Sequence, residues 1–131
     1  MNNKNSKLEQ IQSTPLLSNF SQLASARKIG LVGGSFDPVH KAHLEIARIV
    51  KERYALDAVV FIPAQQNPLK QIAPSASAEQ RLEMLKLALS DFPGGYVSSC
   101  ELSKPEKSFT VDTLEQIHSE LPNAELYWIG G

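Results

Sequence analysis

The chain has 131 residues, of which 13 are basic and 14 are acidic, and its formal net charge is -1. Domains commonly contain about 100–200 residues, so this length predicts one domain or part of one. The near-neutral charge argues against nucleic acid as a partner and against a polybasic membrane anchor. The single cysteine, Cys100, excludes an internal disulfide framework and a cysteine-rich metal site, and it favours a cytoplasmic location.

The N-terminal segment 1–27 differs in pattern from the rest of the chain. It begins as a polar tail, and we interpret it as an extension of the main domain. After Pro15, apolar residues recur at helical spacing and predict a short amphipathic helix that packs on the domain. These apolar residues are Leu16, Leu17, Phe20, Leu23 and Ala24. No apolar stretch approaches the roughly 18–20 residues that a membrane-spanning helix needs, so we expect no membrane partner.

From residue 28 onward, short apolar runs alternate with amphipathic segments. The apolar runs predict strands, and the amphipathic segments predict helices, the second of which has Ser77 as a typical N-cap. The expected strands are 28–33, 57–64, 96–101 and 125–129, and the expected helices are 40–54, 78–91 and 110–121. This alternation is typical of the α/β class, in which a parallel sheet carries helices on both faces. Residues 28–131 therefore predict one α/β domain.

The segment Gly33–His43 carries the strongest functional signal. Two glycines end the first strand, and the loop after them leads into the start of a helix. At a helix start, free backbone N–H groups and the positive end of the helix dipole favour a phosphate group. His40 and His43 stand three residues apart, so both imidazoles can point toward the same anion. The pattern is neither the dinucleotide-binding G-x-G-x-x-G fingerprint nor a P-loop.

Each of these features has a plainer alternative. A glycine pair often marks only a tight turn, and Asp37-Pro38 is ordinary turn chemistry. The two histidines are also compatible with a solvated helix start or with part of a zinc site. Zinc needs three or four ligands, however, and no nearby side chain completes the set, so we expect no metal ligands here. Trp128, on the last expected strand, is more typical of a core residue than of an aromatic stacking platform. Taken together, the glycines, the helix start and the histidines favour phosphate binding.

Residues 33–43 resemble the signature G-G-[ST]-F-D-P-x-H-x-G-H of the nucleotidyltransferase superfamily, whose members transfer adenylyl or cytidylyl groups. Further segments are similar to motifs of bacterial nicotinate-nucleotide adenylyltransferases. They are F-I-P-A at 61–64, N-P-L-K at 67–70, R-L-E-M-L at 81–85, S-F-T-V-D-T-L at 108–114 and Y-W-I-G at 127–130. The resemblance implies a Rossmann-like nucleotidyltransferase fold. With the four expected strands numbered in chain order, it implies the sheet order 3-2-1-4.

The resemblance also implies an activity. Enzymes of this family transfer AMP from ATP to nicotinate mononucleotide, which yields nicotinate adenine dinucleotide and pyrophosphate in NAD biosynthesis. They form no covalent enzyme intermediate, and a magnesium ion (Mg²⁺) accompanies ATP and is held mainly by the phosphates. The implied partners are therefore ATP and nicotinate mononucleotide, and a homo-oligomer is left open.

The same resemblance implies roles for particular residues. As catalytic residues, His40 and His43 would stabilise charge on the ATP phosphates. The ATP site would comprise Gly33, Gly34, Ser35, Phe36, His40 and His43. The nicotinate mononucleotide site would comprise Asp37, Lys70, Phe109 and Thr110, with Asp112 and Thr113 ordering the loop that recognises the nicotinate carboxylate.

Some residues depart from the family pattern. Ala42 replaces a glycine between the histidines, Leu69 replaces a histidine, and Phe109 replaces a tyrosine. The family pattern also continues beyond Gly131, which implies the N-terminal portion of such an enzyme with its final elements missing. Two alternatives stay open. One is a truncated nucleotide-binding module without catalysis, and the other is an adenylyltransferase for pantetheine phosphate, in which threonine would replace Ser35.

Overall fold

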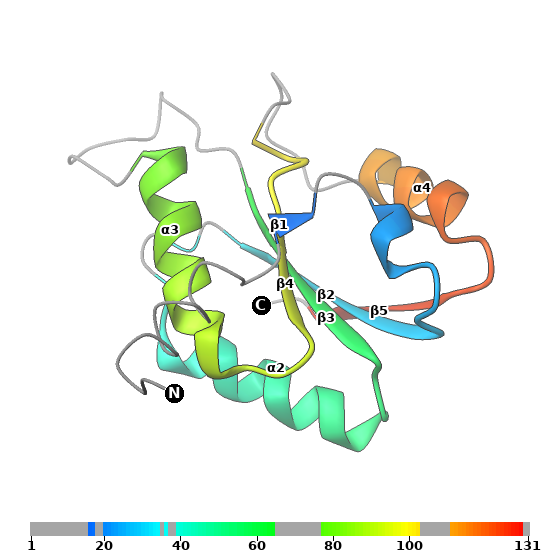
Figure 1. The fold of residues 1–131 in the computed structure, drawn as a ribbon, viewed down its shortest axis with the longest axis horizontal. Coiled ribbons are helices and arrows are strands. Elements are labelled where there is room, and N and C mark those ends of the chain that lie inside the picture. The colour runs from blue at the N-terminus through cyan, green and yellow to red at the C-terminus, as the bar shows by residue number, and fades with distance from the viewer. Residues whose placement is uncertain are drawn as a thin grey trace, which may run out of the picture.

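The computed structural model of the chain describes residues 16–17, 20–34, 36, 39–64, 77–102 and 111–129. These residues form a parallel sheet of five strands in the order β1-β4-β3-β2-β5, with helices packed against it (Figure 1). The strands are β1 (Leu16–Leu17), β2 (Lys28–Gly34), β3 (Ala58–Pro63), β4 (Gly95–Ser98) and β5 (Glu125–Ile129). The helices are α2 (Lys41–Arg53), α3 (Ala78–Ala88) and α4 (Val111–Glu120), with short 3-10 turns η1 (Phe20–Leu23) and η3 (Leu89–Asp91). The predicted α/β class with a Rossmann-like parallel sheet is confirmed.

β2 is the second strand from the β5 edge of the sheet, and it pairs with β3 on one side and with β5 on the other. Its register places Gly33 opposite Ile62 of β3, and Val32 opposite Ile129 of β5. The four strands expected from the sequence therefore lie in the order 3-2-1-4 that the resemblance implied. β5 forms one edge of the described sheet, and β1 forms the other.

The alternation of side chains along β2 divides the core into two layers. Ile29 and Leu31 point to the face covered by η1 and α4, whereas Val32 points to the face covered by α2 and α3. Figure 1 shows this division, with α2 and α3 on one side of the sheet and α4 and η1 on the other. The prediction of helices on both faces is therefore confirmed. Among the described residues, no helix combines the length and the apolar character needed to cross a bilayer.

Local signals account for the start of α3. The Ser77 hydroxyl accepts a hydrogen bond from the backbone N–H of Gln80 at 3.1 Å, and the Gln80 side chain accepts one from the N–H of Ser77 at 2.9 Å. This reciprocal pair is a capping box, which satisfies two donors that the first turn of a helix leaves free. The predicted N-cap at Ser77 is confirmed.

The helix expected over residues 16–24 is wrong for its first part. Leu16 and Leu17 form β1, which pairs in parallel with Val97 and Ser98 of β4. The second part is only the 3-10 turn η1, whose residue Phe20 is buried beneath α4 with 1% of its surface exposed. Spacing of apolar residues cannot reveal that the edge of β4 offers backbone hydrogen bonds, and this tertiary pairing decides the conformation. Residues 1–15 lie outside the described residues, and the division into 1–27 and 28–131 stays a prediction.

Asp57 connects the amino ends of β2 and β3. Its Oδ2 accepts hydrogen bonds from the backbone N–H groups of Lys28, at 3.0 Å, and Arg27, at 2.9 Å. The N–H of Asp57 donates in turn to the carbonyl of Lys28 at 2.8 Å. The two backbone donors, that of Lys28 above all, hold the pKa of the Asp57 carboxyl below its ordinary value of 3.8.

We expect Asp57→Asn to remove a stabilisation that depends on pH. Because the pKa of Asp57 is lower in the folded state, its carboxylate stabilises the fold fully above the ordinary value of 3.8 and loses that effect as pH falls through the folded-state value. The melting temperature of the wild type should exceed that of the variant at neutral pH, and the two should converge in strong acid. Thermal unfolding followed by circular dichroism from about pH 7 to about pH 2.5 measures the difference. A difference that stays constant over this range would contradict the assignment.

Candidate functional site

The candidate site lies at the carboxyl end of β2. β2 ends with Gly33 and Gly34, and the chain then passes through Phe36 to His40, which precedes α2. After β2 the chain adds β3 and then β4 on one side of β2, and only the last strand, β5, is added on its other side. The switch point of the sheet therefore falls between β2 and β5. In open α/β sheets, ligands bind at the carboxyl ends of the strands beside this point.

Gly33 lies directly against the indole of Trp128 on β5. A Cβ atom at Gly33 would overlap the Cη2 atom of this ring, at a separation that real side chains do not reach. The missing side chain at position 33 is thus explained by the close approach of Trp128. The indole itself is 48% exposed, so the interpretation of Trp128 as a core residue is wrong. It contributes instead to the surface next to the switch point.

Phe36 anchors the loop of the candidate site in the hydrophobic core. Its ring is 2% exposed, belongs to the core layer under α2 and α3, and packs against Phe61 with ring centroids 5.8 Å apart. The backbone of Phe36 has φ 47°, in the left-handed region that a phenylalanine rarely adopts. This conformation costs free energy, which burial of the large ring offsets. A ligand at the site would therefore meet the backbone of Phe36 and not its ring.

His40 and His43 stand together at the start of α2. Their rings lie 5.7 Å apart between centroids and are inclined by 27°. The rings of Phe36 and His43 form a T-shaped pair with centroids 5.2 Å apart. The backbone N–H of His40, the N-cap residue, donates to Nδ1 of His43 at 3.0 Å. A neutral His43 therefore carries its proton on Nε2, because Nδ1 acts as the acceptor. The ring presents an Nε2–H donor that the capping hydrogen bond leaves free.

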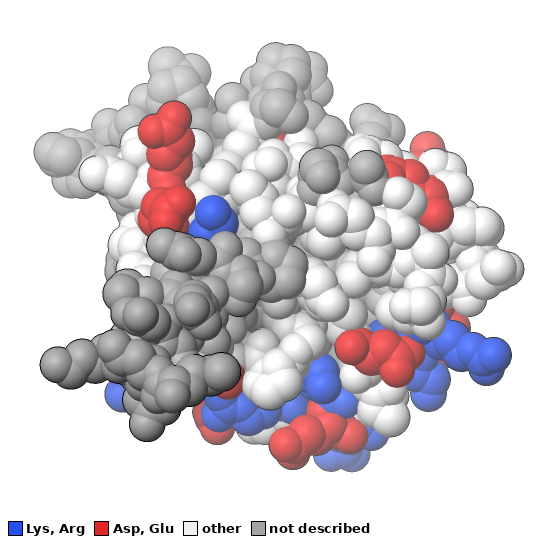
Figure 2. Space-filling view, in the orientation of Figure 1, with Lys and Arg blue, Asp and Glu red and all other residues white. Residues whose placement is uncertain are grey.

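The surroundings of this helix start suit an anion. In the first turn of α2 the N–H of His43 donates to the carbonyl of His40 at 3.0 Å, whereas the N–H groups of Lys41 and Ala42 precede the first i−4 partner that the helix offers. The macrodipole adds partial positive charge at this helix start. No acidic residue lies in that first turn. Figure 2 shows Lys, Arg, Asp and Glu side chains mixed along the side of the molecule where α2 lies, without a broad patch of one sign on the face shown. Attraction for a phosphate is therefore local to the helix start.

The remaining predicted site residues have different outcomes. Ser35, Asp37, Lys70, Phe109 and Thr110 lie outside the described residues. Asp112 is in the first turn of α4, and nothing is described of its side chain. Thr113, predicted to order a loop, is buried in the same turn with 0% of its surface exposed. Among the described residues, no group of three or more His, Cys, Asp or Glu side chains is placed to hold a metal ion.

The sequence left Arg81 open between a solvated side chain and, from the family resemblance, a structural salt bridge. This side chain on α3 is 2% exposed, and its guanidinium donates to the carbonyl of Ala64 at 2.6 Å. Ala64 follows β3 directly, and its own N–H donates to the carbonyl of Gly34 at 2.7 Å. Arg81 thus fixes the exit of β3 beside the exit of β2. The motif R-L-E-M-L contained this residue, but a charged residue on an amphipathic helix usually lies in solvent.

Glu101 is the second buried charge that sequence reasoning missed. It lies after β4 with 1% of its surface exposed, and the hydroxyl of Thr113 donates a hydrogen bond to its Oε2 atom. A glutamate near the end of an expected strand gives no sign of burial in the sequence. Arg81 contacts Ala64, the residue after β3, and Glu101 follows β4, so both buried charges lie at the carboxyl end of the sheet.

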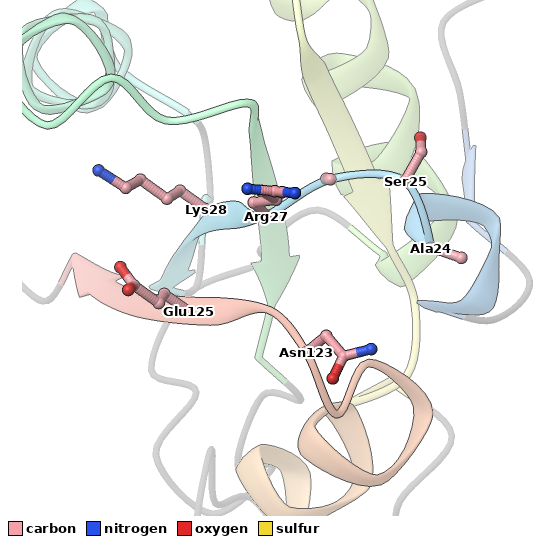
Figure 3. A pocket seen from close by; sticks show the side chains of 7 residues that line it. Ala24, Ser25, Arg27, Lys28, Asn123 and Glu125 are labelled. Atoms are coloured by element: carbon pink, nitrogen blue, oxygen red, sulfur yellow. The ribbon is translucent and has the colours of Figure 1, made fainter.

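A cavity of about 580 Å³ lies at the amino ends of β2 and β5, at the other end of these strands from the candidate site (Figure 3). It is lined by Ala24, Ser25, Ala26, Arg27, Lys28, Asn123 and Glu125. In Figure 3 the side chains of Lys28 and Glu125 extend to the same side, so a cation and a carboxylate share this end of the cavity. The seven residues of β2, which span roughly 20 Å, separate this cavity from the histidines. The cavity is therefore distinct from the candidate site.

Comparisons with known proteins match the chain from β2 onward. The family model for cytidylyltransferase-like proteins matches residues 31–131. A protein of Methylacidiphilum infernorum, named "Probable nicotinate-nucleotide adenylyltransferase", is 41% identical over 104 residues, which cover 79% of this chain and 51% of that protein. A protein of the same name from Herpetosiphon aurantiacus is 44% identical over 105 residues, which cover 80% of this chain and 52% of that protein. The chain thus spans about half the length of the curated relatives that it matches.

A solved structure has the same fold. The structure of Plasmodium falciparum nicotinic acid mononucleotide adenylyltransferase complexed with NaAD aligns with a TM-score of 0.66 and 20% sequence identity. The alignment covers 78% of this chain and 50% of that chain. At this identity the likeness concerns the fold, while the sequence matches carry the family assignment.

Proposed function

The chain belongs to the cytidylyltransferase-like family, and we propose that it acts in the transfer of AMP from ATP to nicotinate mononucleotide. The products would be nicotinate adenine dinucleotide and pyrophosphate, as the resemblance implied. The observation that carries this proposal is the pair His40 and His43 at the start of α2, with an Nε2–H donor on His43 that the capping hydrogen bond leaves free. The names of the relatives that match over 79–80% of the chain support the choice of substrates.

The proposed chemistry is a direct displacement at phosphorus. A phosphate oxygen of nicotinate mononucleotide attacks the α-phosphorus of ATP, and a new P–O bond forms. The bond from the α-phosphorus to the oxygen bridging toward the β-phosphorus breaks, and pyrophosphate leaves with that electron pair. Such a transfer requires alignment and charge stabilisation more than a protein nucleophile. His43 would donate through Nε2–H to an ATP phosphate oxygen as negative charge grows on the leaving group, and His40 would assist it.

The other proposed contacts follow the predicted site. Backbone groups of the β2 exit would contact ATP, and these belong to Gly33, Gly34, Ser35 and Phe36. Lys70 and Asp37 would lie near the mononucleotide, and Lys70 would bind its phosphate. The segment with Phe109 and Thr110 would recognise the nicotinate carboxylate, while Asp112 and Thr113 would order that segment.

We propose that Mg²⁺ enters as part of the ATP substrate. His40 and His43 could offer Mg²⁺ only nitrogen ligands, whereas this ion prefers oxygen ligands such as phosphates and water. The phosphates of ATP would therefore supply its ligands, and the ion would neutralise part of their charge. The chain has one cysteine, Cys100, and thus no internal disulfide, which favours the reducing cytoplasm as the place of the reaction.

The decisive experiment is an assay of pyrophosphate release by the 131-residue chain with ATP and nicotinate mononucleotide. We expect release that depends on both substrates, with a reaction lacking the mononucleotide as the control. Because the chain spans about half the length of its relatives, a non-catalytic nucleotide-binding module is the second candidate. Binding of ATP in a calorimeter without any release would favour that module. Neither binding nor release would contradict both.

A further inference from the structure

Arg81 is buried in the first turns of α3, where a cation is costly. Its side chain is 2% exposed, although arginine is almost never fully buried unless its donors are paired. The guanidinium donates to the carbonyl of Ala64 at 2.6 Å, a short hydrogen bond of the charge-assisted kind. An apolar side chain of similar volume would pack here without the cost of taking a charge out of water. Stability alone is therefore a weak reason for an arginine at this position.

The residue that Arg81 binds joins the exits of two neighbouring strands. Ala64 follows β3 directly, and its N–H donates to the carbonyl of Gly34, the last residue of β2, at 2.7 Å. The N–H of Ala64 is thus held by β2, and its carbonyl is held by α3. Because each peptide group is planar, these two hydrogen bonds fix the orientation of the backbone on both sides of Ala64.

Gly34 in turn contacts the ring that supports His43. A Cβ atom at Gly34 would stand 3.4 Å from Cε1 and Cζ of Phe36, so the Phe36 ring lies against this glycine. The same ring forms the T-shaped pair with His43, at 5.2 Å between centroids. Two hydrogen bonds and two contacts of the Phe36 ring therefore connect Arg81 to His43. Contiguous packing and hydrogen bonds of this kind carry coupling between separate positions.

We infer that Arg81 is a positioning residue for the binding of ATP phosphates at the start of α2. This role rests on the proposed function, and it consists in holding the exits of β3 and β2 in the arrangement that places His43. A displacement of about 1 Å in a group that binds substrate is costly, so a buried anchor behind the site has a functional effect. The role requires a hydrogen-bond donor on the side chain at position 81 and an N–H at position 64.

The first test measures the binding of ATP with Mg²⁺ to the full chain by calorimetry. Arg81→Leu removes the donor, and Ala64→Pro removes the N–H that holds Gly34, a change that the extended backbone of Pro63 tolerates. We expect each variant to raise the Kd of ATP about tenfold. Arg81→Lys keeps a cationic donor and should restore the Kd to within about threefold of the wild type. The double variant Arg81→Leu/Ala64→Pro should resemble the single variants, because both break the same connection.

Leu89→Ala is the structural control. Leu89 follows α3 directly and is 3% exposed, and its Cδ2 would stand 3.3 Å from a Cβ atom at Gly95, the first residue of β4. It therefore packs at the amino end of β4, away from the exits of β2 and β3. Its truncation should lower the melting temperature and leave the Kd of ATP unchanged. An equal increase of the Kd in Leu89→Ala and Arg81→Leu would overturn the inference.

The imidazole nitrogens of His43 provide a readout that needs no substrate. In proton–nitrogen correlation spectra, the Nδ1 signal of His43 reports the hydrogen bond that it accepts from the N–H of His40. We expect this signal to shift in Arg81→Leu toward that of a histidine that exchanges between tautomers. The exposed His118 gives the reference signal in the same spectrum, and neither signal should shift in Leu89→Ala.

The outcomes distinguish the positioning role from the proposed function. An unchanged His43 signal in Arg81→Leu, or an effect confined to the melting temperature, would overturn the inference. If Arg81→Leu does not fold, Ala64→Pro carries the same test, because it breaks the connection without removing the buried charge. If the wild type binds no ATP, the proposed function fails separately, and the His43 signal still decides whether Arg81 positions that ring.

Discussion

Replacement of His43 by alanine is expected to lower the turnover number of the proposed transfer by at least ~10²-fold, the usual effect of losing one donor that stabilises developing negative charge. The physical reason is the orientation of the ring. Its Nδ1 accepts the backbone N–H of His40 at 3.0 Å, and the T-shaped contact with Phe36, at 5.2 Å between centroids, holds the ring. Nε2–H is then the group available to an ATP phosphate. Initial rates of pyrophosphate release at saturating ATP and nicotinate mononucleotide measure the effect.

Two further variants separate catalysis from helix capping. In His43→Asn the side-chain oxygen can still accept the His40 N–H, but no group replaces Nε2. We expect turnover to fall in both His43 variants, while the free energy of unfolding falls only in His43→Ala, by about 0.5–2 kcal/mol. His118 lies exposed on α4, and His118→Ala is the matched control with normal turnover. Turnover of His43→Ala close to that of the wild type would refute the assigned role.

The fold from β2 to β5 could be predicted because its elements follow local rules. Short apolar runs such as that of β3 bury both faces of a parallel strand, and the helices between them carry one apolar face each. The order of the strands needed the family resemblance, since periodicity alone does not select strand neighbours. β1 could not be predicted, because Leu16 and Leu17 form a strand only where β4 offers its edge.

The candidate site was predictable to a smaller extent. The spacing of His40 and His43 at a helix start placed the two rings together, as the structure does. The contact of Gly33 with Trp128 joins two strands far apart in the sequence, so the glycine pair was interpreted as part of a phosphate site or as a tight turn, and its close packing was not foreseen. The burial of Arg81 and Glu101 also depends on tertiary packing, which no local pattern encodes. The roles of the predicted residues in binding and catalysis stay predictions.

Replacement of Phe36 by alanine is expected to have two separable effects. Loss of the buried ring should lower the free energy of unfolding by about 3–5 kcal/mol, the range for phenylalanine removed from a core. Turnover should fall as well, because the edge-on contact that holds the His43 ring disappears with it. The left-handed backbone at Phe36 does not relax in the variant, since alanine is strained there too. Chemical unfolding and initial rates, taken at a temperature where the variant is folded, measure the two effects.

Phe92 provides the matched control, because it loses the same ring from the same core layer. It is 6% exposed and meets Phe61 at 6.0 Å between centroids, as Phe36 does at 5.8 Å. The ring contacts described for Phe92 involve Phe61 and Arg48 and not the histidines. We expect Phe92→Ala to be destabilised to a similar extent and to keep the turnover of the wild type. If the alanine variants do not fold, Phe36→Leu and Phe92→Leu give the same comparison at a smaller loss of stability. Equal turnover in the two variants would mean that Phe36 serves the core alone, whereas a loss confined to Phe36 would trace the orientation of His43 to this buried ring.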